Sequence, residues 1–370
     1  MTGSQVPAHL AGAVLTIDLD AVADNYRTVL RHLDGVPSAA VVKADGYGLG
    51  AKQIGPALAA AGCTVFFVAH IHEGVILRAV LPDAEIHILN GVLPDAMETM
   101  RKFRLVPVLG SLGDIDAWKG RGAAAPLPCD IHVDTGMLRL GLPPAELAVL
   151  AEDATRLGGM DVRYVMSHLA SADEAGSEQN ARQLAAFHAA RRILPMGQAC
   201  FANSSGVFLG PDYHFNMARP GVALYGVNPT PGQSNPMAGT VTLKSRILQV
   251  RDANRGDTVG YGASHAIDGK AKIATLPVGY ADGYLRSLSN GGQGIIDGIP
   301  VPLVGRVSMD LITLDVTAVP DAKRQPGQWV ELIGPHNPVD AVAVAAGTIG
   351  YEILTSLGAR YHRRYLGGPS

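Results

Sequence analysis

Lys43 is the side chain in this sequence that is best suited to covalent chemistry. It ends an apolar run, Ala39–Lys43, with the composition of a buried parallel strand. A lysine that loses hydration has a lowered pKa, which frees its amine to act as a nucleophile or Schiff-base former. Gly46 and Gly48 flank Tyr47 in a loop whose backbone could approach a ligand closely. A lysine that extends its charge into solvent from a strand end explains the same pattern without chemistry.

Arg139 and His168 each follow an apolar run. The segment 133–141, VDTGMLRLG, places Arg139 beyond such a run, where its planar guanidinium could bind a carboxylate through two hydrogen bonds. His168 comes shortly after the run 162–166. The simpler interpretations are a surface arginine beside a capping Asp134, and a buried histidine with a structural role.

A further group of candidates lies in the motifs FANSSG and FNMARPGVALYG. Asn203 and Ser204 stand at a predicted strand-to-helix junction, where hydroxyl and backbone N–H groups suit an anion. Arg219, Gly221 and Val222 follow in the second motif. Because a plain helix cap explains the asparagine and serine equally well, the pattern leaves both interpretations open.

Glycine-flanked tyrosines recur in the second half of the chain. Tyr261 lies in GYGASH, and Tyr280 and Tyr284 lie in VGYADGY. One such tyrosine is uninformative, because phenols commonly lie between core and surface. Three together are more informative, and with the residues above they indicate an enzyme.

These residues need elements to position them, and up to about residue 226 short apolar runs alternate with amphipathic segments. This alternation predicts a parallel sheet. About eight such units favour a closed (β/α)8 TIM-like barrel, with the chemistry at the carboxyl ends of its strands. The predicted strands are Val14–Leu19, Ala39–Lys43, Thr64–Val68, Ile86–Leu89, Leu105–Leu109, Cys129–Val133, Val162–Met166, Gln198–Ala202 and Val222–Tyr225.

The pattern changes after Tyr225. Residues 226–239 are rich in Gly, Pro, Asn and Ser, which is typical of a linker. Beyond them, alternating segments separated by turn residues predict antiparallel strands, with one helix over Val339–Ala346. We therefore predict an α/β protein with a barrel domain at residues 1–238 and a mostly β C-terminal domain at residues 239–370.

The composition narrows the classes of function. The chain has 370 residues, 47% of them hydrophobic, and a formal net charge of -3. This charge provides no basic surface for nucleic acid, and no stretch reaches the ~18 apolar residues of a membrane span. The scattered cysteines Cys63, Cys129 and Cys200 are typical of reduced core residues. We expect a soluble cytoplasmic protein with no metal, nucleic-acid partner or membrane partner.

Taken together, the motifs resemble those of the alanine racemases, pyridoxal phosphate (PLP) enzymes of fold type III. The resemblance extends nearly end to end, and the ordered set is far more specific than any one motif. The motifs are AVVKADGYGLG, VDTGMLRLG, SHLASADE, ANSSG, FNMARPGVALYG, GYGASH, VGYADGY, GRVSMD and TIGYE. The resemblance implies a PLP-binding barrel, a β domain, and a head-to-tail homodimer whose active sites are completed by the partner's second domain.

By this resemblance, two residues act as bases. Lys43 binds PLP and acts on one face of the substrate Cα, and Tyr261 of the partner subunit acts on the opposite face. Racemisation requires this arrangement, because one base takes the proton and the other returns it with inverted geometry. Arg139 and the backbone amide of Met309 bind the carboxylate of the substrate.

The resemblance also assigns the rest of the site. Arg219 faces the pyridine nitrogen of PLP, and a guanidinium does not give up its proton to that nitrogen. Tyr280, with Tyr351, narrows the path of the substrate. The other cofactor-binding residues are Tyr47, His168, Asn203, Ser204, Gly221, Val222 and Tyr351.

Two positions depart from the family's pattern. His132 stands where many members have a carbamylated lysine, whose negative charge orients the arginine that corresponds to Arg139. His132 itself, another side chain or a bound anion must then orient Arg139. Ser308 stands where a cysteine is frequent. Both departures bear on substrate range and rate.

Several functions remain open at this level. The first is interconversion of L- and D-alanine, for peptidoglycan or for alanine catabolism. A racemase of broader range, acting on serine or other amino acids, is the nearest alternative. A fold-type III decarboxylase is disfavoured by Arg219, where those enzymes have a glutamate, and a non-catalytic PLP carrier is disfavoured by the second domain with Tyr261.

Overall fold

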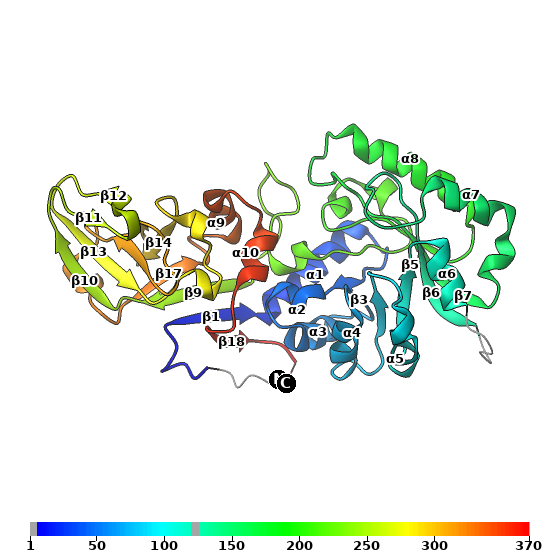
Figure 1. Cartoon of the computed structure of the whole chain (residues 1–370), viewed down its shortest axis with the longest axis horizontal. Helices are drawn as coiled ribbons and strands as arrows, with labels where there is room; N and C mark the ends of the chain where they lie inside the picture. Colours follow the sequence, from blue (N-terminus) through cyan, green and yellow to red (C-terminus); the bar gives the residue numbers. More distant parts are fainter. Residues whose placement is uncertain (1–5, 120–125, 370) are drawn as a thin grey trace.

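The computed structural model describes residues 6–119 and 126–369, and a seven-stranded parallel sheet forms the centre of its N-terminal half (Figure 1). Each strand pairs in parallel with the next. In order, the strands are β2 (Ala40–Val41), β3 (Val65–Val68), β4 (Glu85–Ile88), β5 (Leu105–Leu109), β6 (Leu127–His132), β7 (Met160–Met166) and β8 (Gln198–Cys200). Strands β3 and β5 are buried at every position, as expected where both faces of a sheet are covered.

Segment 216–220 links the two edges of this sheet. Met217 forms a parallel bridge with Cys200 of β8, and Ala218 forms one with Ser38, just before β2. The sheet is therefore closed into a barrel. This confirms the TIM-like fold predicted from the sequence.

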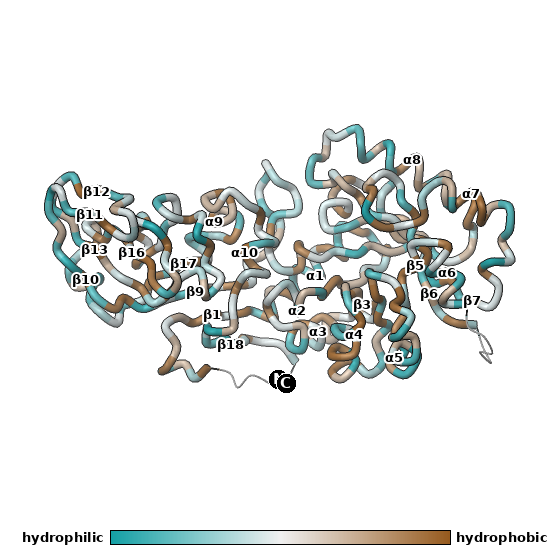
Figure 2. Tube along the Cα trace, viewed as in Figure 1, coloured by the Kyte–Doolittle hydropathy of each residue, from teal (hydrophilic) through white to brown (hydrophobic). Residues whose placement is uncertain are grey.

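Helices connect the strands and cover the barrel. Asp18 caps the first helix by accepting a hydrogen bond from the N–H of Ala21, and Ser111 caps α6 by accepting from Asp114. In Figure 2 the barrel strands near β3 and β5 are largely brown, whereas teal segments run through α8 and the outer loops. The helices are α1 (Leu19–Leu33), α2 (Lys43–Tyr47), α3 (Ala51–Ala60), α4 (Ile71–Arg78), α5 (Met97–Lys102), α6 (Leu112–Trp118), α7 (Pro144–Glu152) and α8 (Glu178–Ile193).

Two predicted barrel strands are not barrel strands. The run predicted at Val14–Leu19 forms β1 (Ala13–Asp18). In the C-terminal sheet, β1 pairs antiparallel with β9 (Val241–Arg246) and parallel with β18 (His362–Leu366). The run predicted at Val222–Tyr225 is a short 3-10 helix, η5. Segment 216–220 takes the eighth position instead, where Pro220 cannot donate to a regular ladder.

The C-terminal half is mostly β, as predicted. Its largest sheet has the order β15 (Ile299–Pro302), β14 (Gln293–Ile296), β17 (Trp329–Ile333), β9 (Val241–Arg246), β1 and β18 (His362–Leu366). Two smaller sheets contain β10 (Gln249–Ala253), β13 (Ala271–Leu276) and β16 (Ile312–Asp315), and β11 (Thr258–Val259) and β12 (His265–Ala266). Helices α9 (Val339–Ala346) and α10 (Gly350–Ser356) follow, and Figure 1 shows α10 between this half and the barrel. The division at residues 238 and 239 stays a prediction.

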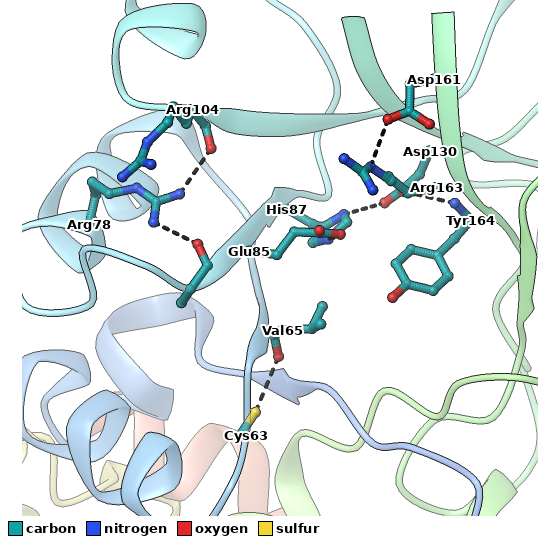
Figure 3. A network of polar contacts seen from close by, with 11 residues as sticks. Cys63, Val65, Arg78, Glu85, His87, Arg104, Asp130, Asp161, Arg163 and Tyr164 are labelled. Atoms are coloured by element: carbon teal, nitrogen blue, oxygen red, sulfur yellow. Dashed lines mark hydrogen bonds and ion pairs between the residues drawn. The ribbon is translucent and has the colours of Figure 1, made fainter.

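A buried ionic cluster lies among the barrel strands (Figure 3). His87 of β4 and Asp130 of β6 are both fully buried, and the Nδ1 of His87 lies 2.6 Å from the Oδ2 of Asp130. The Nε2 of His87 lies 2.8 Å from the Oε1 of Glu85. The imidazole stacks on Phe67 of β3, with ring centroids 4.5 Å apart.

Among the described residues, no helix is long and apolar enough to cross a bilayer.

Candidate active site

A cavity of ≈ 450 Å³ opens at the carboxyl ends of the barrel strands. It brings together all the barrel residues that the sequence singled out, and Tyr351 of α10. Its lining residues are Val41, Lys43, Tyr47, Leu89, Asn90, His132, Arg139, Leu140, Met166, His168, Asn203, Ser204, Arg219, Gly221, Val222 and Tyr351. A larger hollow of ≈ 800 Å³ beside α1 is lined by no lysine or arginine of the described ranges 6–119 and 126–369, so it lacks a lysine amine that could bind an aldehyde covalently and a guanidinium that could bind a carboxylate by charge.

Lys43 follows β2 at this cavity. Burial lowers the pKa of Lys43, and the positive charges of Arg139 and then Arg219 lower it further. Glu73 opposes this effect only in part. The side chain therefore has more neutral amine at neutral pH than a solvated lysine, which favours nucleophilic chemistry over the simple surface interpretation.

The segment α2 (Lys43–Tyr47) is a loop rather than a regular helix, and its backbone is unusual. Ala44, Asp45 and Tyr47 all have positive φ, at 53°, 52° and 55°. Such conformations cost free energy in residues other than glycine and persist only when their surroundings fix them. Here the Oε1 of Glu73 accepts a hydrogen bond from the N–H of Ala44 at 2.6 Å, and the Oδ1 of Asp45 accepts one from the N–H of Ala51 at 2.8 Å.

This loop directs Tyr47 into the cavity. Its ring is buried and stacks on Tyr225, with centroids 4.5 Å apart. A Cβ on Gly221 would lie only 2.2 Å from the phenol oxygen of Tyr47, so the two segments can approach only because residue 221 is a glycine. Burial raises the pKa of Tyr47, and it raises that of Tyr351 to about 12. Both phenols therefore stay protonated and can donate hydrogen bonds.

Arg219 is a buried cation in the segment that closes the barrel, with 3% of its surface exposed. Its Nη2 donates to the carbonyl of Ser167 at 2.5 Å, and its Nε donates to the Sγ of Cys200 at 3.1 Å. The guanidinium carbon lies 5.8 Å from the ring centroid of Phe67. These contacts fix a permanent positive charge in the lining of the cavity.

Burial and this charge together determine the state of two neighbouring histidines. Burial, followed by the charge of Arg219, lowers the pKa of His132 to about 4. The same causes hold the pKa of His168 well below its ordinary value. Both imidazoles are therefore neutral at neutral pH. His132 supplies no negative charge in place of the family's carbamate.

Arg139 stands at the mouth of the cavity in a structured loop. The Oδ1 of Asp134 accepts hydrogen bonds from the N–H groups of residues 136, 137 and 138, at 2.9, 2.9 and 3.2 Å. The hydroxyls of Thr135 and Ser167 lie 2.7 Å apart, and Gln183 donates to Thr135 at 3.1 Å. Asp134 thus caps the loop, as the simpler interpretation predicted. The same loop places Arg139 in the lining of the cavity, so a capping Asp134 and a carboxylate-binding Arg139 are compatible.

Asn203 and Ser204 show features of both interpretations offered above, a cap and an anion site. The Oδ1 of Asn203 accepts from the N–H of Gly206 at 2.9 Å, which is a capping contact. The Oγ of Ser204 accepts from the N–H groups of Gly221 and Ala223, at 2.9 and 3.2 Å. The serine therefore orients the backbone around residue 222 at the edge of the cavity.

Three predicted residues do not line this cavity. Tyr261 and Tyr280 begin the short 3-10 helices η6 (Tyr261–Ala263) and η7 (Tyr280–Asp282), and Met309 lies on the loop before β16. All three are exposed, at 73%, 43% and 54%. The single chain therefore brings the barrel residues together but does not bring these three to Lys43.

Sequence reasoning missed other residues of the site. Asn90 and Leu89 line the cavity at the end of a predicted strand, so the rule that placed Lys43 could have found them. Glu73, which supports the loop after Lys43, and Gln183, which supports the loop of Arg139, lie on helices far along the chain. Spacing gives no signal for such contacts.

Comparison with known proteins agrees with this geometry. Residues 17–229 match the family model of the alanine racemase N-terminal domain, and residues 240–365 match that of the C-terminal domain. Among curated relatives, the catabolic alanine racemase of Mesorhizobium japonicum is 48% identical and covers 100% of this chain and 97% of its own. The alanine racemase of Rhodospirillum rubrum is 49% identical, with 96% of each chain covered.

The fold of this chain is also similar to those of solved structures. The alanine racemase of Bartonella henselae, with covalently bound pyridoxal phosphate, has a TM-score of 0.91 and 43% identity, covering 96% of this chain and 100% of that one. The biosynthetic alanine racemase of Pseudomonas aeruginosa has a TM-score of 0.91 and 34% identity, with the same coverage. Since the family models and these relatives match nearly the whole chain, this chain belongs to the alanine racemase family.

Proposed function

We propose that this chain is a cytoplasmic, PLP-dependent racemase that interconverts L- and D-alanine. The observation that supports it most is the cavity at the carboxyl ends of the barrel strands. There a lysine of lowered pKa, two arginines and a set of hydroxyl and backbone N–H groups meet. The D-alanine would serve the cell wall, or the reaction would serve alanine catabolism.

The residues present fit PLP. The close approach of Gly221 to Tyr47 leaves no room for a Cβ, and the protonated phenols and Ser204 form a donor set for a phosphate. Lys43 would hold the aldehyde carbon, and Arg219 would face the pyridine nitrogen. When bound, the cofactor withdraws electrons from the substrate Cα and so acidifies its C–H bond. Arg219 keeps its own proton throughout, because a guanidinium has a pKa above ~12.

Arg139 would bind the carboxylate of the substrate through its planar fork. Its place at the mouth of the cavity, in a loop shaped by Asp134, supports this role. The backbone amide of Met309 would give a second donor, and Tyr280 with Tyr351 would narrow the path of the substrate.

Two bases would move the proton. Lys43 would take the Cα proton on one face or return it there, and Tyr261 would do the same on the opposite face. A phenol has an ordinary pKa near ~10, so it needs a nearby positive charge to act as a base, which Arg139 would provide.

This arrangement requires a homodimer. Tyr261, Tyr280 and Met309 are exposed on the chain that bears them and do not line its cavity. We propose that two copies associate head to tail, so that these residues complete the cavity of the partner.

The test is incubation of the purified protein with L-alanine in D2O, with and without added PLP. We expect PLP-dependent formation of D-alanine that has deuterium at Cα. If PLP is bound but neither D-alanine nor exchange appears, the proposal is wrong for alanine. A parallel incubation with L-serine then separates a racemase of another amino acid from a protein that only binds the cofactor.

A further inference from the structure

Arg360 makes ion pairs with two loops of the C-terminal half: residues 279–283, which contain the short 3-10 helix η7, and residues 308–311. Its Nε lies 2.6 Å from the Oδ1 of Asp282, and its Nη2 lies 2.8 Å from the Oδ2 of the same carboxylate. Its Nη1 lies 2.7 Å from the Oδ1 of Asp310. The planar guanidinium thus binds one carboxylate through two hydrogen bonds and still reaches a second one.

Asp282 is the fixed end of this arrangement. It is buried, with 4% of its surface exposed, and its Oδ2 also accepts a hydrogen bond from the N–H of Gly279 at 2.8 Å. Its backbone carbonyl accepts from the N–H of Gly358 at 2.9 Å. Loss of the guanidinium would leave a buried carboxylate without its counter-charge, and such a charge forces its surroundings to rearrange.

The two loops also contact each other directly. The N–H of Tyr280 donates to the carbonyl of Ser308, and the N–H of Ala281 donates to that of Met309, each at 3.0 Å. A Cβ on Gly279 would lie 2.3 Å from the carbonyl oxygen of Met309, so the backbones are in close contact. Arg360 adds a third link between the loops, through side chains.

The same region contacts α10. A Cβ on Gly283 would lie only 1.7 Å from the carbonyl oxygen of Ser356, the last residue of that helix. Helix α10 bears Tyr351, which lines the cavity of its own chain, and Figure 1 shows it between the two halves. Arg360 thus lies where an element of one cavity meets the loops that bear Tyr280 and Met309.

We propose that Arg360 is a positioning residue for the active site of the partner subunit. It holds Tyr280 and the backbone amide of Met309 in a fixed relation, so that both reach the substrate in the other chain's cavity. This inference rests on the proposed function and on its shared site. Arg360 acts through these loops in this arrangement, because it does not line the cavity of its own chain and three of its N–H groups are engaged by Asp282 and Asp310.

The first measurement is the steady-state kinetics of Arg360→Gln. We expect KM for L-alanine to rise about ten- to a hundredfold, because small displacements of binding groups have effects of this size. The absorbance of bound PLP should change little, since Lys43, which would bind it, lies in the barrel, and Tyr351 of α10 is the one proposed cofactor-binding residue outside the barrel. Arg360→Lys should give an intermediate KM, because an ammonium cannot bind Asp282 through two hydrogen bonds.

Arg324→Gln is the matched control. Arg324 lies in the same half, pairs with Asp321 and donates to the carbonyls of Val316 and Thr317, both at 3.0 Å. None of these partners belongs to the two loops. If the two variants lower the melting temperature equally and have the same KM for L-alanine, the role of Arg360 is merely structural and the inference is wrong.

Hybrid dimers test whether Arg360 acts on the active site of the partner subunit or on that of its own chain. One protomer has Lys43→Ala and the other has Tyr261→Phe, so the one complete site takes its loops from the Lys43→Ala protomer. Arg360→Gln should raise KM when placed in that protomer and have little effect in the other. An active parental hybrid with equal effects of the two placements overturns the inference. An inactive parental hybrid, despite subunit exchange, refutes the shared site and the inference with it.

Discussion

Asp130→Asn should lower the free energy of unfolding by about 3–5 kcal/mol, the range seen when one partner of a buried ion pair is removed. Asp130 and His87 are both fully buried, 2.6 Å apart, and the imidazole reaches Glu85 on its other side at 2.8 Å (Figure 3). The Oδ1 of Asp130 also accepts a hydrogen bond from the N–H of Tyr164 at 3.2 Å. Asparagine keeps the volume of the side chain but leaves the imidazole without its buried counter-charge.

The pH dependence of stability tests this electrostatic origin. Burial alone would lower the pKa of His87, but the charge of Asp130 and the hydrogen bonds to both carboxylates raise it to about 9. A rise from the ordinary ~6.5 to about 9 favours the charged imidazole by about 3 kcal/mol. Because this pKa is raised in the folded state, the contribution is complete below about pH 6.5 and is lost as pH rises through about 9. The stability difference between the native chain and the variant should shrink over this range.

The assay is urea unfolding, at fixed protein and cofactor concentration, near pH 6.5, 8 and 9.5. Trp118 of α6 is 1% exposed and reports on the barrel by fluorescence. Asp161→Asn is the control, because its carboxylate pairs with Arg163 on β7 at 3.1 Å with both side chains about half exposed, and such pairs contribute about 0–1 kcal/mol. Equal losses in the two variants, or a loss that is the same at every pH, would refute the reasoning.

Three further variants test the site itself. Lys43→Ala should abolish racemisation and change the absorbance spectrum of bound PLP, and an unaltered spectrum would contradict its assignment. Tyr261→Phe should abolish racemisation while PLP stays bound, and retained activity would exclude the two-base scheme. Gly221→Ala should weaken PLP binding about tenfold, because its methyl group would overlap Tyr47, and fluorescence titration with PLP measures this. Unchanged affinity would mean that the loop after Lys43 moves freely.

The barrel site was predictable because its geometry follows from topology. Lys43, His168 and Asn203 come at or just after the ends of different apolar strands, and parallel strands in a barrel bring those ends to one face. Residues far apart in sequence therefore meet in one cavity without any signal between them. The chemistry of the site needed the family resemblance as well, since strand ends alone do not distinguish a cofactor site from a helix cap.

The errors in the fold have physical causes too. Strand β1 alternates buried and half-buried residues, the pattern of a sheet covered on one face, whereas β3 and β5 are buried throughout. Its partner β18 lies at the opposite end of the sequence, and no local pattern encodes such pairing. Segment 216–220 closes the barrel through isolated bridges, without the length or periodicity of a strand.

Tyr261 shows a different limit of sequence reasoning. A phenol that exchanges a proton at neutral pH needs a place close to its substrate and a positive charge beside it. On the single chain it is 73% exposed and does not line the cavity that contains Lys43, so the first condition is not met. The proposed homodimer would meet it across the interface between the two chains. Periodicity and spacing describe how one chain folds on itself and contain no information on that interface, so the assignment of Tyr261 depends on the resemblance alone.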